Sequence, residues 1–122
     1  MNLLSFLRTQ VRANRLANHR LYAAMATLSH DALHAPRTSF FPSLAATLDH
    51  ILWVDGYYLD CLEGRSDARA RALAWVPRST LVALSAEQAA SDERFIALLD
   101  AATAADLARI VQQRDEAFIA GC

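Results

Sequence analysis

A run of residues spaced alternately three and four positions apart opens the chain and constrains its fold more than any other feature. The run comprises Leu4, Leu7, Val11, Asn14, Asn18, Leu21, Met25 and Leu28. This spacing places the residues on one face of an α-helix. A helix over residues 2–28 would be about 40 Å long, at ~1.5 Å per residue. That length is typical of a helical bundle.

Two asparagines, Asn14 and Asn18, interrupt this otherwise apolar stripe. Buried amides need hydrogen-bond partners, so the two side chains either bond across the core or line a polar cavity. Partial exposure, through splaying of the helices, is the alternative interpretation. The sequence leaves both open.

Residues 29–42 contain two of the three prolines and break the helical pattern, so we expect a connection there. A second helix is predicted over residues 43–62, with Ser43 as its N-cap and Gly64 just beyond its end. Its expected core face is Leu44, Leu48, Ile51, Asp55, Tyr58 and Leu62. Further apolar residues extend this face almost around the helix, which indicates a helix that is central or covered by a partner.

The second half of the chain predicts two more helices. Residues 63–79 mix charges, Ala and Pro without a period, which predicts a loop with room for one helical turn. A third helix is expected over residues 80–101, and Thr103 with Asp106 resembles a capping box that opens a fourth over 104–120. The expected core face of the third helix is Leu81, Leu84, Gln88, Ser91, Phe95, Leu98 and Ala102. With no strand pattern, we predict an all-α bundle forming one domain over residues 1–122.

Composition narrows the class of protein. A chain of 122 residues with 54% hydrophobic residues can bury a core without disulfides or structural metal. Its twelve basic residues, all Arg, and thirteen acidic ones give a net charge of -1, which argues against a nucleic-acid partner. With no apolar run long enough for a bilayer and no secretion signal, we expect no membrane partner and a cytoplasmic location. Cys61 and Cys122 lack the spacing of a redox or zinc pair and are expected to be reduced.

Three stretches of the first half resemble the DinB family of helical bundles. They are Asn-Arg-x-x-Asn-x-Arg-x-Tyr from Asn14 to Tyr22, the loop over residues 35–43, and Thr47-Leu48-x-His50-Ile51-Leu52-x-x-Asp55. The resemblance covers residues 14–64, and residues 91–111 are compatible with the third helix of the family. The resemblance implies a DinB-like up-down helical bundle, which we expect to be shortened at its carboxyl end.

The resemblance also implies a metal site and an assembly. Members of the family are often homodimers and hold a divalent metal (zinc, nickel or iron) with three histidines. The residue that matches the histidine of the second helix is His50. The other two usually form a His-x-x-x-His pair on a later helix, a spacing that brings two imidazoles together one turn apart. This sequence has no histidine after His50, so the ligand set is expected to be incomplete.

Other histidines are weaker candidate ligands. His30 and His34 are four apart and could share a metal within a helix, but the nearby Pro36 and the resemblance favour a surface turn. His19 lies one position off the apolar stripe and is expected to be exposed. His50 itself is predicted on a face that flanks the core.

The remaining chemical groups have structural interpretations as well. Asp49 and Asp55 could be carboxylate ligands, but Asp49 lies outside the predicted core face and Asp55 could pair with Arg12 or Arg15. Cys61 is about three helical turns from His50, ~16 Å, too far for that imidazole to activate the thiol. Three aromatic residues lie close together in the second helix: Trp53, Tyr57 and Tyr58. Such a group is more typical of a core or an interface than of a ligand site.

Two functions from different classes follow. The resemblance implies a divalent-metal-dependent thiol transferase or hydrolase, in which the metal lowers the pKa of a small-molecule thiol that attacks an electrophile, with His50 as its recognisable ligand. The alternative is a non-catalytic helical module for dimerisation or partner binding, which the apolar second helix favours. A homodimer is expected in both.

Overall fold

A computed structural model describes residues 2–108, and every regular element among them is a helix. The elements are α1 (Leu3–Met25), α2 (His30–His34), α3 (Leu44–Leu62), α4 (Ala68–Leu73), α5 (Leu81–Ala101) and α6 (Ala104–Leu107). The bounds of the three long helices lie within three residues of those predicted from the sequence. Most of the predicted fourth helix, residues 109–120, lies outside the described residues.

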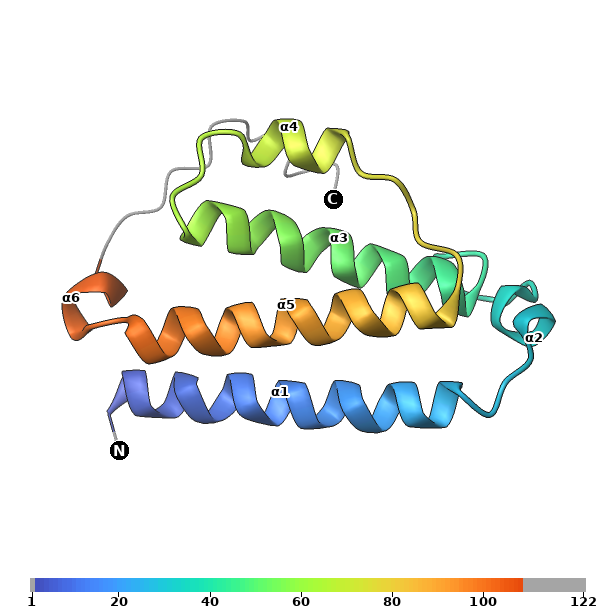
Figure 1. The fold of residues 1–122 in the computed structure, drawn as a ribbon, viewed down its shortest axis with the longest axis horizontal. Helices are drawn as coiled ribbons and strands as arrows, with labels where there is room; N and C mark the ends of the chain where they lie inside the picture. The colour runs from blue at the N-terminus through green and yellow to red at the C-terminus, as the bar shows by residue number, and fades with distance from the viewer. Residues whose placement is uncertain (1, 109–122) are drawn as a thin grey trace.

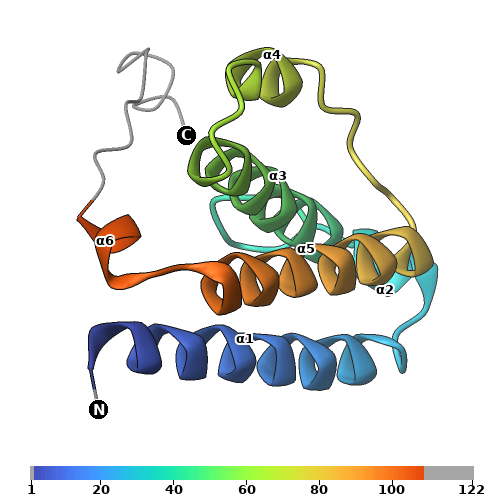
Figure 2. The same cartoon turned by 60° about the vertical axis from the view of Figure 1, so that its left-hand side comes forward.

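The long helix α5 lies between α1 and α3 (Figures 1 and 2). Helix α1 runs antiparallel to α5 and packs extensively on that helix. Helices α3 and α5 run in the same direction, because α4 and the connection after it return the chain along the outside of α3 (Figure 1). The all-α bundle predicted from the sequence is therefore confirmed, while the parallel pair of α3 and α5 departs from a simple up-down order (Figure 1).

Local signals explain where the helices begin and end. The Ser43 and Thr80 side chains accept hydrogen bonds from backbone N–H groups at the starts of α3 and α5, at 3.1 and 3.2 Å. Gly64 follows α3 with a φ of 80°, which favours glycine. Its N–H donates to Cys61 O, and the Arg65 N–H donates to Asp60 O, the two bonds of a Schellman motif.

The connection over residues 29–42 departs from the prediction. It contains α2, which passes through both His30 and His34 despite the proline that follows. The Ser29 side chain caps its start, and Ala35 is already extended, with ψ 140°. Because the residue before a proline favours extended backbone, Pro36 ends this helix without disrupting it.

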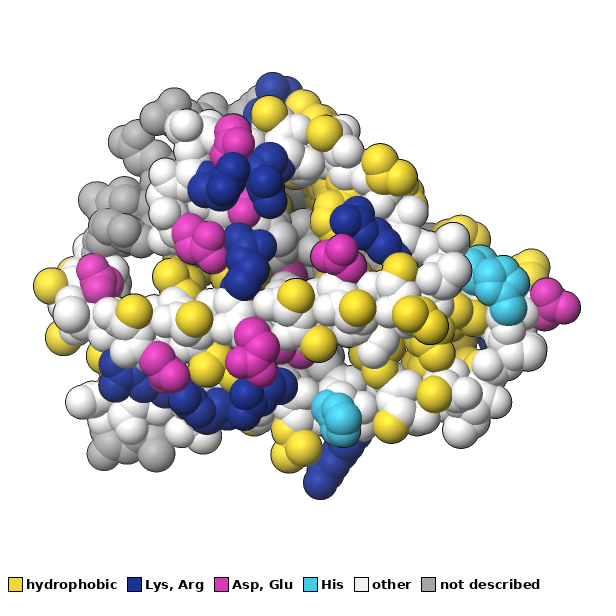
Figure 3. All heavy atoms as spheres, viewed as in Figure 1, with side chains coloured by type: hydrophobic (Ala, Val, Ile, Leu, Met, Phe, Trp, Pro, Cys, Tyr) yellow, Lys and Arg dark blue, Asp and Glu magenta, His cyan; other side chains and the backbone are white. Residues whose placement is uncertain are grey.

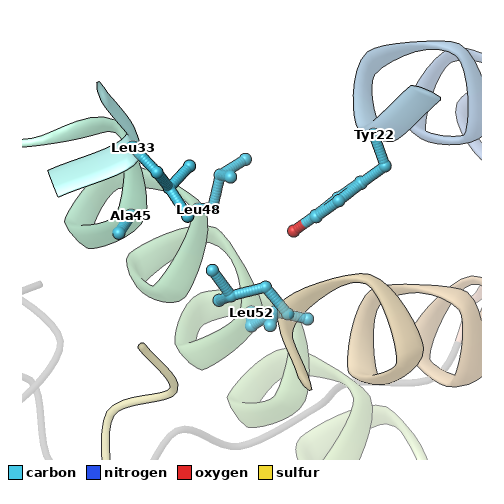
Figure 4. Close-up of a cluster of buried hydrophobic side chains, with 6 residues drawn as sticks. Tyr22, Leu33, Ala45, Leu48 and Leu52 are labelled. Atoms are coloured by element: carbon cyan, nitrogen blue, oxygen red, sulfur yellow. The ribbon is translucent and has the colours of Figure 1, made fainter. Parts of the chain in front are cut away.

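The core forms where α1, α2, α3 and α5 meet. Its buried residues are Tyr22, Leu33, Ala45, Leu48, Leu52 and Leu84. Figure 4 shows Tyr22 reaching from α1 towards the leucines of α3. This differs from the predicted stripes, because Leu21 is 39% exposed while Tyr22 is 7% exposed. On α3, likewise, Ile51 and Tyr58 are exposed, whereas Leu52 and Leu59 are buried.

Candidate functional site

The predicted metal ligand His50 lies on α3 and is half-buried. Its imidazole packs against two aromatic rings, with centroid distances of 4.5 Å to Phe41 and 5.7 Å to Trp53. Phe41 comes from the connection before α3, and Trp53 lies one turn further along the helix. The structure therefore places His50 in an aromatic contact.

The other histidines lie on different elements. His30 and His34 are brought together on α2, with ring centroids 4.2 Å apart, and His34 Nδ1 lies 2.9 Å from the backbone oxygen of His30. His19 is exposed on α1, as predicted. Within residues 2–108, no three His, Cys, Asp or Glu side chains are grouped so that they could hold a metal ion.

This arrangement tests whether the described residues fit the metal implied by the resemblance. A divalent ion held by protein side chains needs three or four donors at one point. His50 contributes one imidazole among aromatic rings, without a second and third donor from the described part of the chain. The described residues therefore do not complete a metal site, and the metal role of His50 stays a prediction.

Asp49, which the sequence placed outside the core face of its helix, is a buried carboxylate with a structural role. It is 9% exposed. Its oxygens accept hydrogen bonds from Trp75 Nε1, at 3.1 and 3.2 Å, and from the Arg78 backbone N–H, at 2.8 Å. Asp49 thus attaches the connection after α4 to α3, because these bonds cross between the two segments.

Asp55 also differs from the expectation that it pairs with Arg12 or Arg15. Those arginines bind Asp100 and Glu93 of α5 instead. Asp55 accepts a hydrogen bond from Gln88 Nε2 at 3.3 Å. Burial raises its pKa above 3.8, the Gln88 bond opposes that shift, and the charge of the nearby Asp92 adds to it.

Asp92, which the sequence did not single out, is the centre of a polar network between α1 and α5. It is 2% exposed. Its carboxylate accepts hydrogen bonds from Asn14 at 3.2 Å, from Asn18 at 3.0 and 3.1 Å, and from Gln88 at 3.0 Å. Both asparagines therefore bond across the interface between α1 and α5. Partial exposure also describes Asn14, which is exposed, and Asn18 lines a cavity of about 440 Å³.

Burial governs the electrostatics of this network. Burial raises the pKa of Asp92, against the hydrogen bonds from Gln88 and Asn18. Burial also raises the pKa of Tyr22 to about 12, and the charges of Asp92 and Asp49 add to the shift. The Tyr22 hydroxyl is buried without a hydrogen-bond partner among the described residues. The network is therefore a region where charge is costly.

The thiol and the aromatic residues of α3 pack with α4. Cys61 is a half-buried free thiol that packs with Trp53 against a small cluster of Tyr57, Ala68 and Ala72. Tyr57 is 6% exposed and Tyr58 is 39% exposed, with their rings edge to face. The sequence left core and interface open for these aromatic residues, and Tyr57 belongs to the core.

A cavity of about 590 Å³ lies between α3, α4, the connection after α4, and α5. Figure 3 shows dark blue arginine side chains around this part of the surface, with hydrophobic atoms between them. Residues that line the cavity include Trp53, Tyr57, Arg71, Trp75, Ser91 and Arg94. The sequence interpretation missed this site because it treated residues 63–79 as a loop with room for one helical turn, although four arginines and a tryptophan lie there.

The outer face of α1 is a further feature. Among the described helices, α1 packs extensively only on α5, so its opposite face is open. Large apolar side chains are exposed there, with Leu3 at 60%, Phe6 at 46% and Leu21 at 39%. Separately, within residues 2–108 no helix has both the length and the hydropathy that crossing a bilayer requires.

One comparison with known proteins identifies a family. A family model described as DinB superfamily matches residues 13–120. No curated protein and no solved structure matches the chain.

Proposed function

Since this chain belongs to the DinB superfamily, we propose that it acts as a helical binding module that associates with a second copy of itself through the outer face of α1. The observation that carries the proposal is the exposure of Leu3, Phe6 and Leu21 on one side of this helix. Exposed apolar surface of this kind is typical of interaction sites.

The composition of this face suits a partner with the same face. At ~100° per residue, its members fall within one sector of the helix. They are Leu3, Phe6, Gln10, Ala13, Ala17, Leu21 and Ala24, all exposed. None of these side chains is ionisable, so two copies meet without like charges at the contact.

The order of large and small residues favours an antiparallel pair. The large side chains lie towards the two ends of the face and alanines lie at its centre. If two copies of α1 pair about a two-fold axis near Ala13, Phe6 of one helix lies across from Leu21 of the other. Each large ring or branched chain then meets an apolar side chain, and the small central residues let the helices approach closely.

The experiment is the mass of the protein in solution across a range of concentrations. We expect a species of twice 13.4 kDa for the wild type and a monomer for Phe6→Glu. The matched control is Val82→Glu, because Val82 is 82% exposed on α5 and outside the proposed face; it should stay dimeric. A wild-type monomer at all concentrations, or equal dissociation of both variants, would contradict the proposal.

Family membership supports a second candidate function. This is a divalent-metal-dependent thiol transferase or hydrolase with His50 as a ligand. Its test is the metal content of the purified protein. Stoichiometric zinc, nickel or iron that is lost in His50→Ala would support this function. A dimer without metal would favour the binding module alone. The cytoplasmic location stays a prediction.

A further inference from the structure

We propose that the cavity between α3, α4 and α5 binds a small planar molecule that carries one oxyanion group. This site is separate from the dimer face proposed above, since no residue of α1 lines it. Its volume, about 590 Å³, falls in the range of roughly 300–1,000 Å³ that small-molecule sites occupy. Two tryptophans, a serine and three arginines are among the residues that line it.

Both tryptophans of the chain line the cavity, and both are held in place. Trp53 Nε1 donates a hydrogen bond to the backbone oxygen of Ala72 at 2.8 Å. Trp75 Nε1 donates to the Asp49 carboxylate. Because each indole is fixed by its N–H group, the aromatic surfaces are positioned before a ligand arrives. Fixed aromatic surfaces favour a flat, apolar body.

Ser91 supplies a polar group that lacks a hydrogen-bond partner at the cavity. Ser91 is 8% exposed and lines the cavity, and its Oγ is buried with no hydrogen-bond partner among the described residues. Buried hydroxyls in folded proteins are almost always hydrogen-bonded. Rotation of the Ser91 side chain about χ1 would turn this hydroxyl toward the cavity, where a ligand oxygen would provide the missing partner.

Arginines on two sides of the cavity provide the charge. Arg71 donates only its Nε–H within the described structure, to Asp60 at 2.8 Å, which leaves its Nη groups available. Arg94 binds Asp60 and Glu63, and Arg78 lies over the Trp75 ring at 4.0 Å. Guanidinium groups bind carboxylate and phosphate with paired N–H donors.

The acidic groups around the cavity decide whether it prefers an anion or a cation. Asp60 is 3% exposed and binds two guanidinium groups, those of Arg71 and Arg94. Glu87 binds Arg78 at 3.4 Å. Because these carboxylates already have arginine partners, they hold the arginines at the cavity wall and compete little for a cation. The unused Arg71 donors therefore favour an anion.

The probe pair that tests this site is 2-naphthoate and its neutral analogue 2-naphthamide, compared by calorimetry. Binding is located by the indole N–H signals in NMR spectra, because the chain has two tryptophans and both line the cavity. We expect 2-naphthoate to bind, to shift both signals, and to bind about tenfold more tightly than the amide.

Three variants separate the contributions. Arg71→Gln should abolish the preference for the acid over the amide, whereas Arg20→Gln, an exposed arginine on α1, should keep it. Ser91→Ala should weaken both probes without lowering the free energy of unfolding, because its hydroxyl has no partner in the described structure. Phe6→Glu should bind normally, so failure of the dimer and failure of this site are distinguishable.

Several outcomes would overturn the proposal. Equal affinity for the acid and the amide would show that no anion is recognised. Binding that leaves both indole signals unchanged would place the ligand elsewhere. If inorganic phosphate alone shifted the indole signals as strongly as 2-naphthoate, the arginines would be binding ions without a planar body, and the site would not be the one proposed.

Discussion

The amide nitrogen of Asn18 lies 3.0 and 3.1 Å from the two carboxylate oxygens of Asp92, across the interface between α1 and α5. Asp92 is 2% exposed and is not part of an ion pair with an arginine in the described structure. A buried carboxylate without a cation depends on its hydrogen bonds for stability. The pair therefore fixes the register of α1 on α5, because sliding either helix would leave the charge without its donors.

The first prediction is that Asn18→Ala lowers the free energy of unfolding by about 2 kcal/mol, since a hydrogen bond to a charged group contributes ~1.5–3 kcal/mol. The loss should appear as a lower denaturant midpoint in urea. Arg20→Ala, on the exposed side of the same helix, should change the midpoint little. If Asn18→Ala lost no more stability than Arg20→Ala, the prediction would be contradicted, because alanine is the better helix former at both positions.

The second prediction concerns pH and Asp92→Asn. The pKa of Asp92 is raised above its ordinary value of 3.8 in the folded state. The contribution of Asp92 to the free energy of unfolding is therefore largest at a pH below 3.8. The contribution is lost as the pH rises through the raised pKa. The Asn side chain does not titrate, so the free energy of unfolding of the variant, relative to the wild type, should increase between pH 4 and pH 7.

Urea titrations of both proteins across this pH range measure the difference. Taking the difference removes the contributions of groups that are unchanged by the substitution. Asp31→Asn, which neutralises an exposed carboxylate on α2, is the control for general charge effects. A variant that becomes less stable than the wild type as the pH rises would contradict the prediction.

The sequence predicted the helices well and their buried faces less well, for a geometric reason. Alternating steps of three and four average 3.5 residues per turn, whereas an α-helix has ~3.6, so the face drifts by about 20° per heptad. Eighteen residues make five turns, so Tyr22 rather than Leu21 lies in line with Leu4. The structure buries Tyr22 and leaves Leu21 39% exposed.

The polar network could be predicted only in part. Asn14 and Asn18 were recognisable because amides are unusual on an apolar stripe. Their partner was not, because Asp92 is more than seventy positions away in the sequence. The cavity was harder still, since it forms only when the connection after α4 is attached to Asp49 of α3. Packing between distant segments creates both features.

The third prediction concerns His50 in protein treated with a chelator. His50→Ala removes the ring that packs against Phe41 and Trp53, so it should lower the free energy of unfolding by about 1 kcal/mol, the contribution typical of an aromatic contact. His50→Phe keeps the packing and should restore much of the loss. Thermal unfolding of both variants without metal measures this.

Calorimetry with zinc or nickel then separates packing from coordination. A single imidazole binds a divalent ion weakly, so we expect no tight binding to the wild type. Tight binding that both His50 variants lose would contradict this expectation and establish His50 as a ligand.

The last prediction is that Tyr22→Phe is tolerated or stabilising. The Tyr22 hydroxyl is buried with no hydrogen-bond partner in the described structure, and burial raises its pKa to about 12. Removing an unsatisfied polar group loses no hydrogen bond and relieves its desolvation cost. The free energy of unfolding should therefore stay the same or rise by up to about 1 kcal/mol.

Tyr22→Ala provides the contrast, because the ring is part of the core (Figure 4). Truncating a buried aromatic residue to Ala costs about 3–5 kcal/mol. Urea unfolding of both variants should thus show opposite effects at one position. If Tyr22→Phe were itself destabilised by more than about 1 kcal/mol, a typical buried hydrogen bond, its hydroxyl would have a partner in solution. The interior between α1 and α3 would then contain a bound polar group.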